Sequence, residues 1–127
     1  MKSIMKLPRI YTDENGETHF DEIEWRLEVL DFVPPSPAGY SVTPAMGATD
    51  VRIMRTPAGY VDVFHVVPYR MLVLLLTGEF KLETSDGDFR IIKAGMQFLN
   101  DDTWGKGHQM NEINGREYDM ALIGLQE

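Results

Sequence analysis

The sequence predicts an all-β protein, and three features of the chain lead to this prediction. Polar and apolar residues alternate strictly in several short segments, among them 61–65, 80–83 and 118–122, and alternation is the pattern of a strand with one buried face. Clusters of Gly, Pro, Asn and Asp recur roughly every eight to twelve residues. No segment combines an apolar helical stripe with capping residues. Short strands at this spacing are typical of a sandwich or barrel.

The segment His19–Trp25 also alternates, and we interpret it as a strand. It runs into a stretch in which Ile23, Leu27 and Leu30 have near-helical spacing, so a helix is the competing interpretation for this part of the chain. The alternation favours the strand.

The apolar run Met71–Leu76 predicts a strand that is buried on both faces, because it is too short for a typical helix and Gly78 follows closely. The dipeptides Asp86-Gly87 and Asn114-Gly115 predict type I′ hairpin turns, in which both central residues have positive φ. The proline-rich segment 34–37 is interpreted as a stiff connection between two strands.

The chain has the size of one domain. Its 127 residues are expected to form a single domain with a core over roughly residues 10–125 and an N-terminal arm over residues 1–9. It contains no cysteine, which excludes disulfides, Cys-ligated zinc and thiol nucleophiles. A chain of this length buries enough surface to fold without disulfides or a structural metal ion.

Charge and hydropathy exclude two classes of partner. The formal net charge is −8, whereas nucleic-acid binders present basic patches to phosphates. The longest apolar run has six residues, far short of the roughly twenty of a membrane span, and the N-terminus lacks a signal-peptide core. We therefore expect a cytoplasmic protein that binds neither nucleic acid nor membrane.

The residues around His65 match a known pattern. Gly59 precedes His65 by the spacing of the first cupin motif, and Gly78 closes that motif at the correct distance. The motif's other two metal-ligand positions, a His and a Glu, are occupied by Val67 and Met71. The chain thus resembles the cupin superfamily, which implies a jelly-roll barrel, but it departs from the family at two of the ligand positions.

Two further segments strengthen the resemblance. Residues 95–108 are similar to the second cupin motif, with a loop about two residues longer than usual, and His108 takes the place of the histidine in that motif. Residues 16–20, 64–70 and 101–108 are similar to segments of short single-domain bacterial cupin proteins of unassigned function. The resemblance implies a fold but leaves the reaction open.

In a cupin barrel His65 and His108 would project from facing strands into one cavity, and we predict them as the catalytic residues. Imidazole acts as an acid or a base near neutral pH. A carboxylate on the preceding loop, Asp101 or Asp102, could orient an imidazole; for Asp101 we favour a solvated turn. The role of His19 stays open, with a structural position favoured.

Strict alternation places His65, Val67, Tyr69, Met71 and Val73 on one face. If that face lines the cavity, Val67, Tyr69, Met71 and Val73 form a largely apolar ligand-binding wall. Trp104 is added to this set as a residue that could cap the cavity mouth. Such a wall suits a small, partly apolar organic ligand.

A metal is not expected to be held firmly. Catalytic zinc and non-haem iron sites need three protein ligands, and Val67 and Met71 carry no donor. The cofactor prediction is therefore none, or a divalent ion at His65 and His108 completed by another residue, for which His19, Tyr69 and Asp102 are candidates.

Arginines on strands bear on the charge of the ligand. Arg52 faces opposite to Val51 and Ile53, and an inward Arg52 would select an anion through bidentate pairing. The sequence does not decide which face lines the cavity, and we take outward arginines as the default.

The leading hypothesis is a small-molecule enzyme that uses the pocket histidines for acid–base chemistry, of the isomerase, cyclase, lyase or dehydratase type, metal-free or weakly metal-dependent. The alternatives are a non-catalytic cupin that binds a small ligand and a metal-dependent dioxygenase. Replacing either His65 or His108 by alanine is expected to abolish function at a cost of about 1 kcal/mol in stability. We also expect a homodimer, because cupins pair through edge strands and residues 19–30 supply a suitable strand.

Overall fold

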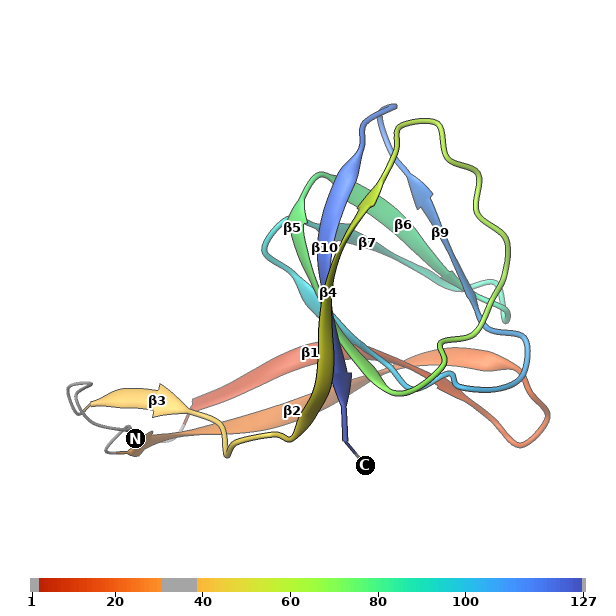
Figure 1. Cartoon of the computed structure of the whole chain (residues 1–127). Coiled ribbons are helices and arrows are strands. Elements are labelled where there is room, and N and C mark those ends of the chain that lie inside the picture. Colours follow the sequence, from red (N-terminus) through yellow and green to blue (C-terminus); the bar gives the residue numbers. More distant parts are fainter. Residues whose placement is uncertain (1–2, 31–38, 127) are drawn as a thin grey trace.

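Figure 1 shows the computed structural model of the chain, which describes residues 3–30 and 39–126. These residues form ten strands and contain no helix, so the all-β prediction is confirmed. The strands are β1 (Ser3–Thr12), β2 (Thr18–Leu30), β3 (Tyr40–Val42), β4 (Ala48–Thr56), β5 (Met71–Thr77), β6 (Glu79–Thr84), β7 (Phe89–Lys93), β8 (Gln97–Asn100), β9 (His108–Glu112) and β10 (Tyr118–Leu125).

The strands make two sheets, with the orders β3-β2-β1-β8-β5-β10-β4 and β7-β6-β9. A single bridge between His65 and His108 adds one more short segment beside β9. From β4 onward, apart from the β6–β7 hairpin, the chain alternates between a layer of β4, β10, β5 and β8 and a facing layer of the His65 segment, β9, β6 and β7. This strand order is the topology of a jelly roll, and the predicted jelly-roll fold is confirmed.

The core lies between the two layers. Its largest fully buried side chains include Phe80, Phe98 and Tyr118, and the rings of Phe80 and Tyr118 stack with centroids 4.8 Å apart. A second, smaller cluster lies on the outer face of the large sheet around Leu7, Leu72 and Leu99.

Strand β5 separates these two clusters. Met71, Val73 and Leu75 belong to the inner cluster, whereas Leu72 and Leu74 belong to or pack against the outer one. The prediction of a strand buried on both faces is thus confirmed for all but Leu76, which is 49% exposed. The side chains from Met71 to Leu75 therefore lie in or against one of the two clusters.

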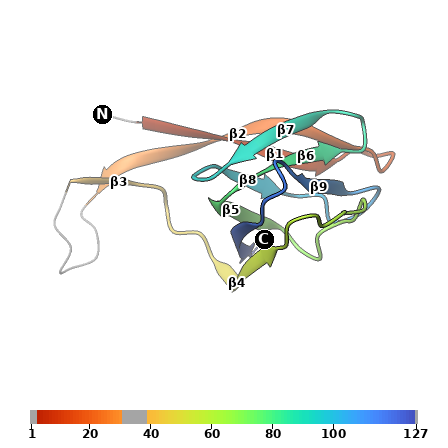
Figure 2. The same cartoon turned by 90° about the horizontal axis from the view of Figure 1, so that it is seen from above.

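The N-terminal residues are part of the fold rather than an arm outside it. Within β1, Leu7 is buried in the outer cluster and Ile10 in the inner one, and the whole strand pairs with β2. Sequence patterning missed β1 because Pro8 interrupts its alternation. The open end of the β1–β2 hairpin, where β1 begins and β2 ends, extends together with β3 away from the layered body (Figure 2).

Strand β2 confirms the strand interpretation of residues 19–30. Among the described residues β3 pairs only with Glu28–Leu30, so most of the outer edge of β2 has no neighbouring strand. The outer face of the large sheet also carries an apolar groove of about 600 Å³ that includes Trp25 and Leu27. These features are compatible with the expected homodimer, which stays a prediction that a measured mass in solution can check.

Three local predictions have different outcomes. Residues 61–65 do not form a strand; only His65 makes a bridge, because Asp62 turns inward to bind the backbone of Met110. Asn114 and Gly115 both have positive φ, as a type I′ turn requires, whereas at the other predicted turn only Gly87 does. The proline segment 34–37 lies outside the described residues.

No helix in the described part of the chain could cross a membrane.

Candidate functional site

The two predicted catalytic histidines are brought together, but on neighbouring rather than facing strands. The His65 amide donates to the His108 carbonyl and the His108 amide donates to the His65 carbonyl, both at 2.9 Å. Residues paired in this way project from the same side of a sheet. Their ring centroids are accordingly 4.7 Å apart.

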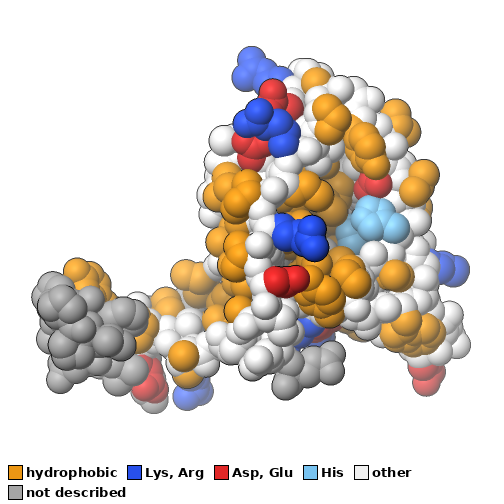
Figure 3. Space-filling view, viewed as in Figure 1, with side chains coloured by type: hydrophobic (Ala, Val, Ile, Leu, Met, Phe, Trp, Pro, Cys, Tyr) orange, Lys and Arg blue, Asp and Glu red, His pale blue; other side chains and the backbone are white. Residues whose placement is uncertain are grey.

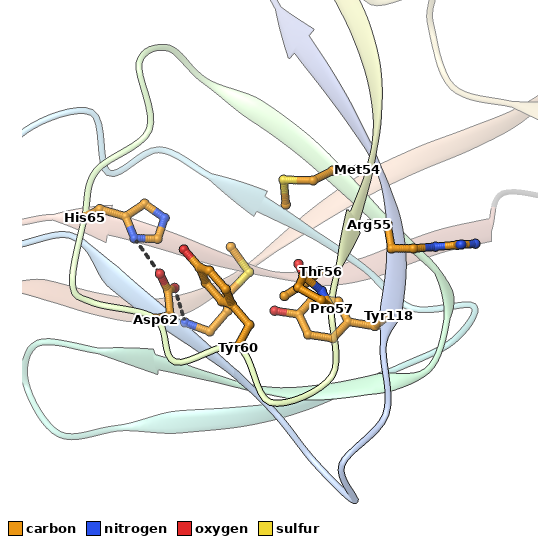
Figure 4. Close-up of a pocket in the computed structure, with 9 residues that line it drawn as sticks. Met54, Arg55, Thr56, Pro57, Tyr60, Asp62, His65 and Tyr118 are labelled. Carbon is orange, nitrogen blue, oxygen red and sulfur yellow. Dashed lines mark hydrogen bonds and ion pairs between the residues drawn. The ribbon is translucent and has the colours of Figure 1, made fainter.

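His65 is held with one ring nitrogen turned to the protein. Its Nδ1 lies 2.7 Å from the carbonyl oxygen of Val63 and 3.5 Å from Oδ1 of Asp62. Because a carbonyl oxygen only accepts, Nδ1 carries the proton, and in the neutral ring Nε2 carries the lone pair. Figure 4 shows this second nitrogen facing the space between Met54 and Tyr60.

Asp62 fixes the position of this imidazole. Its side chain is only 9% exposed, and its Oδ2 accepts the Met110 amide at 2.9 Å. The carboxylate is thus anchored to β9 on one side and faces His65 Nδ1 on the other. A carboxylate in this position stabilises a protonated imidazole when the ring gains a second proton.

His108 has a different environment, because it is fully buried. Its Nδ1 donates to Oδ2 of Asp102 at 2.5 Å, and both side chains are inaccessible to solvent. His108 Nε2 and Asp102 Oδ1 are buried without a hydrogen-bond partner in the described part of the protein. The carboxylate that orients an imidazole is therefore Asp102, and the imidazole is that of His108.

A cavity of about 290 Å³ opens in front of His65. Figure 3 shows a histidine side chain beside a hollow with hydrophobic walls on this face. Burial raises the pKa of the Tyr118 hydroxyl, more than the Thr56 bond lowers it, so this phenol remains a donor at neutral pH. The lining residues are Met54, Arg55, Thr56, Pro57, Tyr60, Asp62, His65, Met110 and Tyr118.

All five predicted ligand-binding residues lie outside the lining of this cavity. Val67, Met71 and Val73 are buried within the inner core cluster, because they pack against the facing layer. The Tyr69 phenol donates to Asp50. Trp104 is 52% exposed and lies against Gly16 at the hairpin turn. Of the predicted residues only His65 lines this cavity.

Sequence reasoning missed the lining contributed by other strands. Met54 and Thr56 pair with Met120 and Tyr118 across β4 and β10, and these residues share the inner face. Alternation in both strands was visible in the sequence, but their register was not. Asp62 was missed because the residues around it read as a strand.

The donor set does not fit the metal that the cupin resemblance implies. Val67 and Met71, at the motif's other ligand positions, are buried among hydrophobic side chains. Across residues 3–30 and 39–126 no three His, Cys, Asp or Glu side chains are grouped to hold a metal ion. No step of the chemistry below is derived through a metal.

The loop that leads to His108 is fastened to the β1–β2 turn. The Lys106 amide donates to the Gly16 carbonyl at 2.9 Å, and its ammonium group lies 2.8 Å from Glu17. The Thr18 hydroxyl, which is fully buried, donates to the Gly107 carbonyl at 2.7 Å. The turn thereby sets the position from which β9 starts.

Asp101, at the start of this loop, is not the solvated turn residue that we favoured. Its carboxylate lies 3.2 Å from the Arg9 guanidinium and 3.0 Å from that of Arg70, and its side chain is 21% exposed. It therefore joins β1 to the segment before β5, a structural role.

His19 crosslinks two turns at the same end of the protein. Its Nε2 lies 2.7 Å from Asp13 and its Nδ1 2.9 Å from Asp86. Only the protonated ring donates to both carboxylates at once. The bonds to Asp13 and then Asp86 raise the pKa of His19 above its ordinary value of 6.5.

We expect this crosslink to make stability depend on pH. A raised pKa in the folded state means that the stabilisation is complete below pH 6.5 and is lost as the pH rises through the folded value. His19→Gln should therefore lower the melting temperature more below pH 6.5 than well above it. The same loss at both pH values in thermal melts would contradict the crosslink.

Comparisons with known proteins add a likeness of fold. No protein-family model and no curated protein matches the sequence. Among solved structures, the chain aligns with a cupin-domain protein from Bordetella pertussis at 21% identity, over 65% of this chain and 96% of the other, with a TM-score of 0.49. The chain is similar to cupin-domain proteins. At such TM-scores the fold assignment rests on the strand order.

Two further structures are similar to the chain. A protein from Neisseria meningitidis aligns at 12% identity over 65% of this chain and 84% of its own, with a TM-score of 0.45. A putative ethanolamine utilization protein Q from Salmonella typhimurium aligns at 14% identity over 97% of both chains, with a TM-score of 0.40. Their likeness says nothing about which reaction, if any, this chain performs.

Proposed function

We propose that the cavity in front of His65 is the active site of a small-molecule enzyme that works by acid–base chemistry without a metal. The reaction class is an isomerisation, cyclisation, elimination or dehydration. The observation that carries the proposal is the orientation of His65, whose protonated Nδ1 is held by the protein while Nε2 faces the cavity. A base positioned in this way is poised to remove a proton from a bound ligand.

The neighbouring groups support this role for His65. When Nε2 takes up a proton, the imidazolium is stabilised by the Asp62 carboxylate near Nδ1. Tyr118 supplies a hydroxyl that stays protonated and can donate to a ligand oxygen as negative charge develops on it. Met54 and Met110 provide an adaptable apolar wall.

His108 is assigned a positioning role in this proposal rather than a catalytic one. It is fully buried and does not line the cavity. Its backbone bonds to His65, and its ring lies beside the His65 ring. It therefore fixes where the base sits, while Asp102 fixes His108.

The proposal is tested by deuterium exchange. Protein treated with a chelator is incubated in D₂O with a panel of small ketones, oxo acids and hydroxy acids. NMR then monitors the uptake of deuterium by each compound and the dehydration of the hydroxy acids. We expect at least one compound to react, and His65→Gln to slow it by about 10²–10⁴-fold. His19→Gln, which removes an imidazole outside the cavity, is the matched control and should keep the native rate.

Two results would contradict the proposal. If His65→Gln reacted at the native rate, His65 would not be the acid–base group. If compounds bound in the cavity and none reacted, the protein would be the non-catalytic ligand-binding cupin.

A further inference from the structure

Arg52 lies on the inner face of the large sheet, contrary to the outward position taken as the default. In the register of β4 and β10, Arg52 pairs with Leu122 just as Met54 pairs with Met120. Met120 is part of the inner core cluster, and Met54 and Leu122 pack against it. Directly paired residues share a face, so Arg52 projects on the same side as the cavity-lining Met54.

The guanidinium of Arg52 forms no ion pair with the described residues, although Asp50 lies two residues away on the same face of β4. The side chain of Arg52 is exposed. In the middle of the face shown in Figure 3, a basic side chain and an acidic side chain lie next to each other, to the left of the histidine. Arg52 is not among the residues that line the cavity, but it lies one same-face position along β4 from Met54, which does line it. A guanidinium in this position can pair with an anionic group of a ligand that extends from the cavity.

The other charged groups near the cavity are already engaged. Asp50 accepts the Tyr69 phenol, and Asp62 accepts the Met110 amide and faces His65. Arg55, the next basic residue on β4, points away from the cavity in Figure 4. It is paired with Asp119 at 2.8 Å and Glu117 at 2.7 Å. Arg52 is thus the cation left free to receive a ligand.

We propose that Arg52 binds the carboxylate of the substrate, so that the ligand of this site is a small monocarboxylate with an apolar body. This inference rests on the proposed function and names its substrate class. The apolar body packs against Met54, Met110 and the ring of Tyr118, and the far part of the ligand meets Nε2 of His65. Anchoring one end at Arg52 orients the reacting carbon toward the base.

The test uses three ligands of nearly equal shape: phenylacetate, phenylacetamide and 2-phenylethylamine. Their dissociation constants are measured by NMR titration of the methyl groups of Met54 and Met110, the two methionines that line the cavity. We expect phenylacetate to bind at least about tenfold more tightly than the amide, and the amine to bind most weakly. Raising the salt concentration should weaken only the phenylacetate complex.

Variants assign this preference to Arg52. Arg52→Gln should remove the advantage of phenylacetate over the amide. Arg52→Lys should retain part of this advantage, because the lysine ammonium keeps the positive charge but cannot form the two parallel hydrogen bonds of a guanidinium. Arg26→Gln is the matched control: Arg26 is an exposed residue of β2, and its loss changes the formal net charge of −8 by the same amount. It should leave all three dissociation constants unchanged.

The outcomes separate this inference from the proposed function. Equal binding of the three ligands, or tighter binding of the amine, would overturn the role of Arg52 and leave the acid–base role of His65 to the exchange experiment. Failure of all three to bind would also overturn the monocarboxylate assignment. An unchanged preference in Arg52→Gln would place the anion site on another residue.

Discussion

Replacing His108 with alanine should lower the free energy of unfolding by about 3 kcal/mol or more. The substitution leaves the carboxyl group of Asp102 fully buried without the partner that lies 2.5 Å from it, and it empties the space of a fully buried ring. Urea denaturation measures the change. The sequence alone led us to expect only about 1 kcal/mol, a value that assumed an imidazole exposed in a cavity.

Two matched variants test this explanation. His65→Ala removes an imidazole that is 43% exposed and whose partners remain solvated or bonded, so it should cost about 1 kcal/mol or less. The double variant His108→Ala with Asp102→Ala should be less destabilised than the sum of its single variants, because the first substitution already breaks the pair. Additive losses would show that the two side chains do not stabilise each other.

The second large effect is expected at Gly107. Its φ is +77°, and a Cβ at this position would collide with the carbonyl group of His65, the group that accepts the His108 amide. Gly107→Ala therefore combines backbone strain with a clash against backbone atoms that cannot rotate away. We expect a loss of several kcal/mol in the free energy of unfolding, well beyond the 1–3 kcal/mol typical of a strained backbone alone.

Gly87→Ala provides the control for Gly107→Ala. Gly87 has a similar φ of +90°, but a Cβ there would meet nothing within 4 Å. This variant isolates the strain of the left-handed backbone, which costs on the order of 1 kcal/mol. Equal losses for the two variants, measured by urea denaturation, would mean that contact between Gly107 and His65 has no separate importance.

The sequence by itself determined the fold class and singled out His65 as a candidate site residue. Alternation and turn residues predicted strands because a half-buried strand needs one apolar side every second residue. The burial of β5 on both faces was predicted from its unbroken apolar run. The Gly59–His65–Gly78 spacing selected His65, the one predicted site residue that lines the cavity.

The pairing of the strands determined which other residues face the cavity. Alternation shows that Arg52 and Val51 face opposite ways, but only the pairing of β4 with β10 shows which of them faces the core. Likewise, Tyr118 and Met54 approach His65 across three separate segments of the chain. Contacts of this kind depend on which strands become neighbours, and no local pattern encodes that.

Burial, too, was decided only by the tertiary structure. His65 and His108 looked equivalent in the sequence, as two histidines in two matching motifs. The fold makes one a cavity residue and the other a fully buried partner of Asp102, because β9 lies between β6 and the His65 segment. A residue in the middle of a sheet is covered by its neighbours, whereas one at the sheet edge meets the cavity and solvent, and this difference gives the two imidazoles their separate roles.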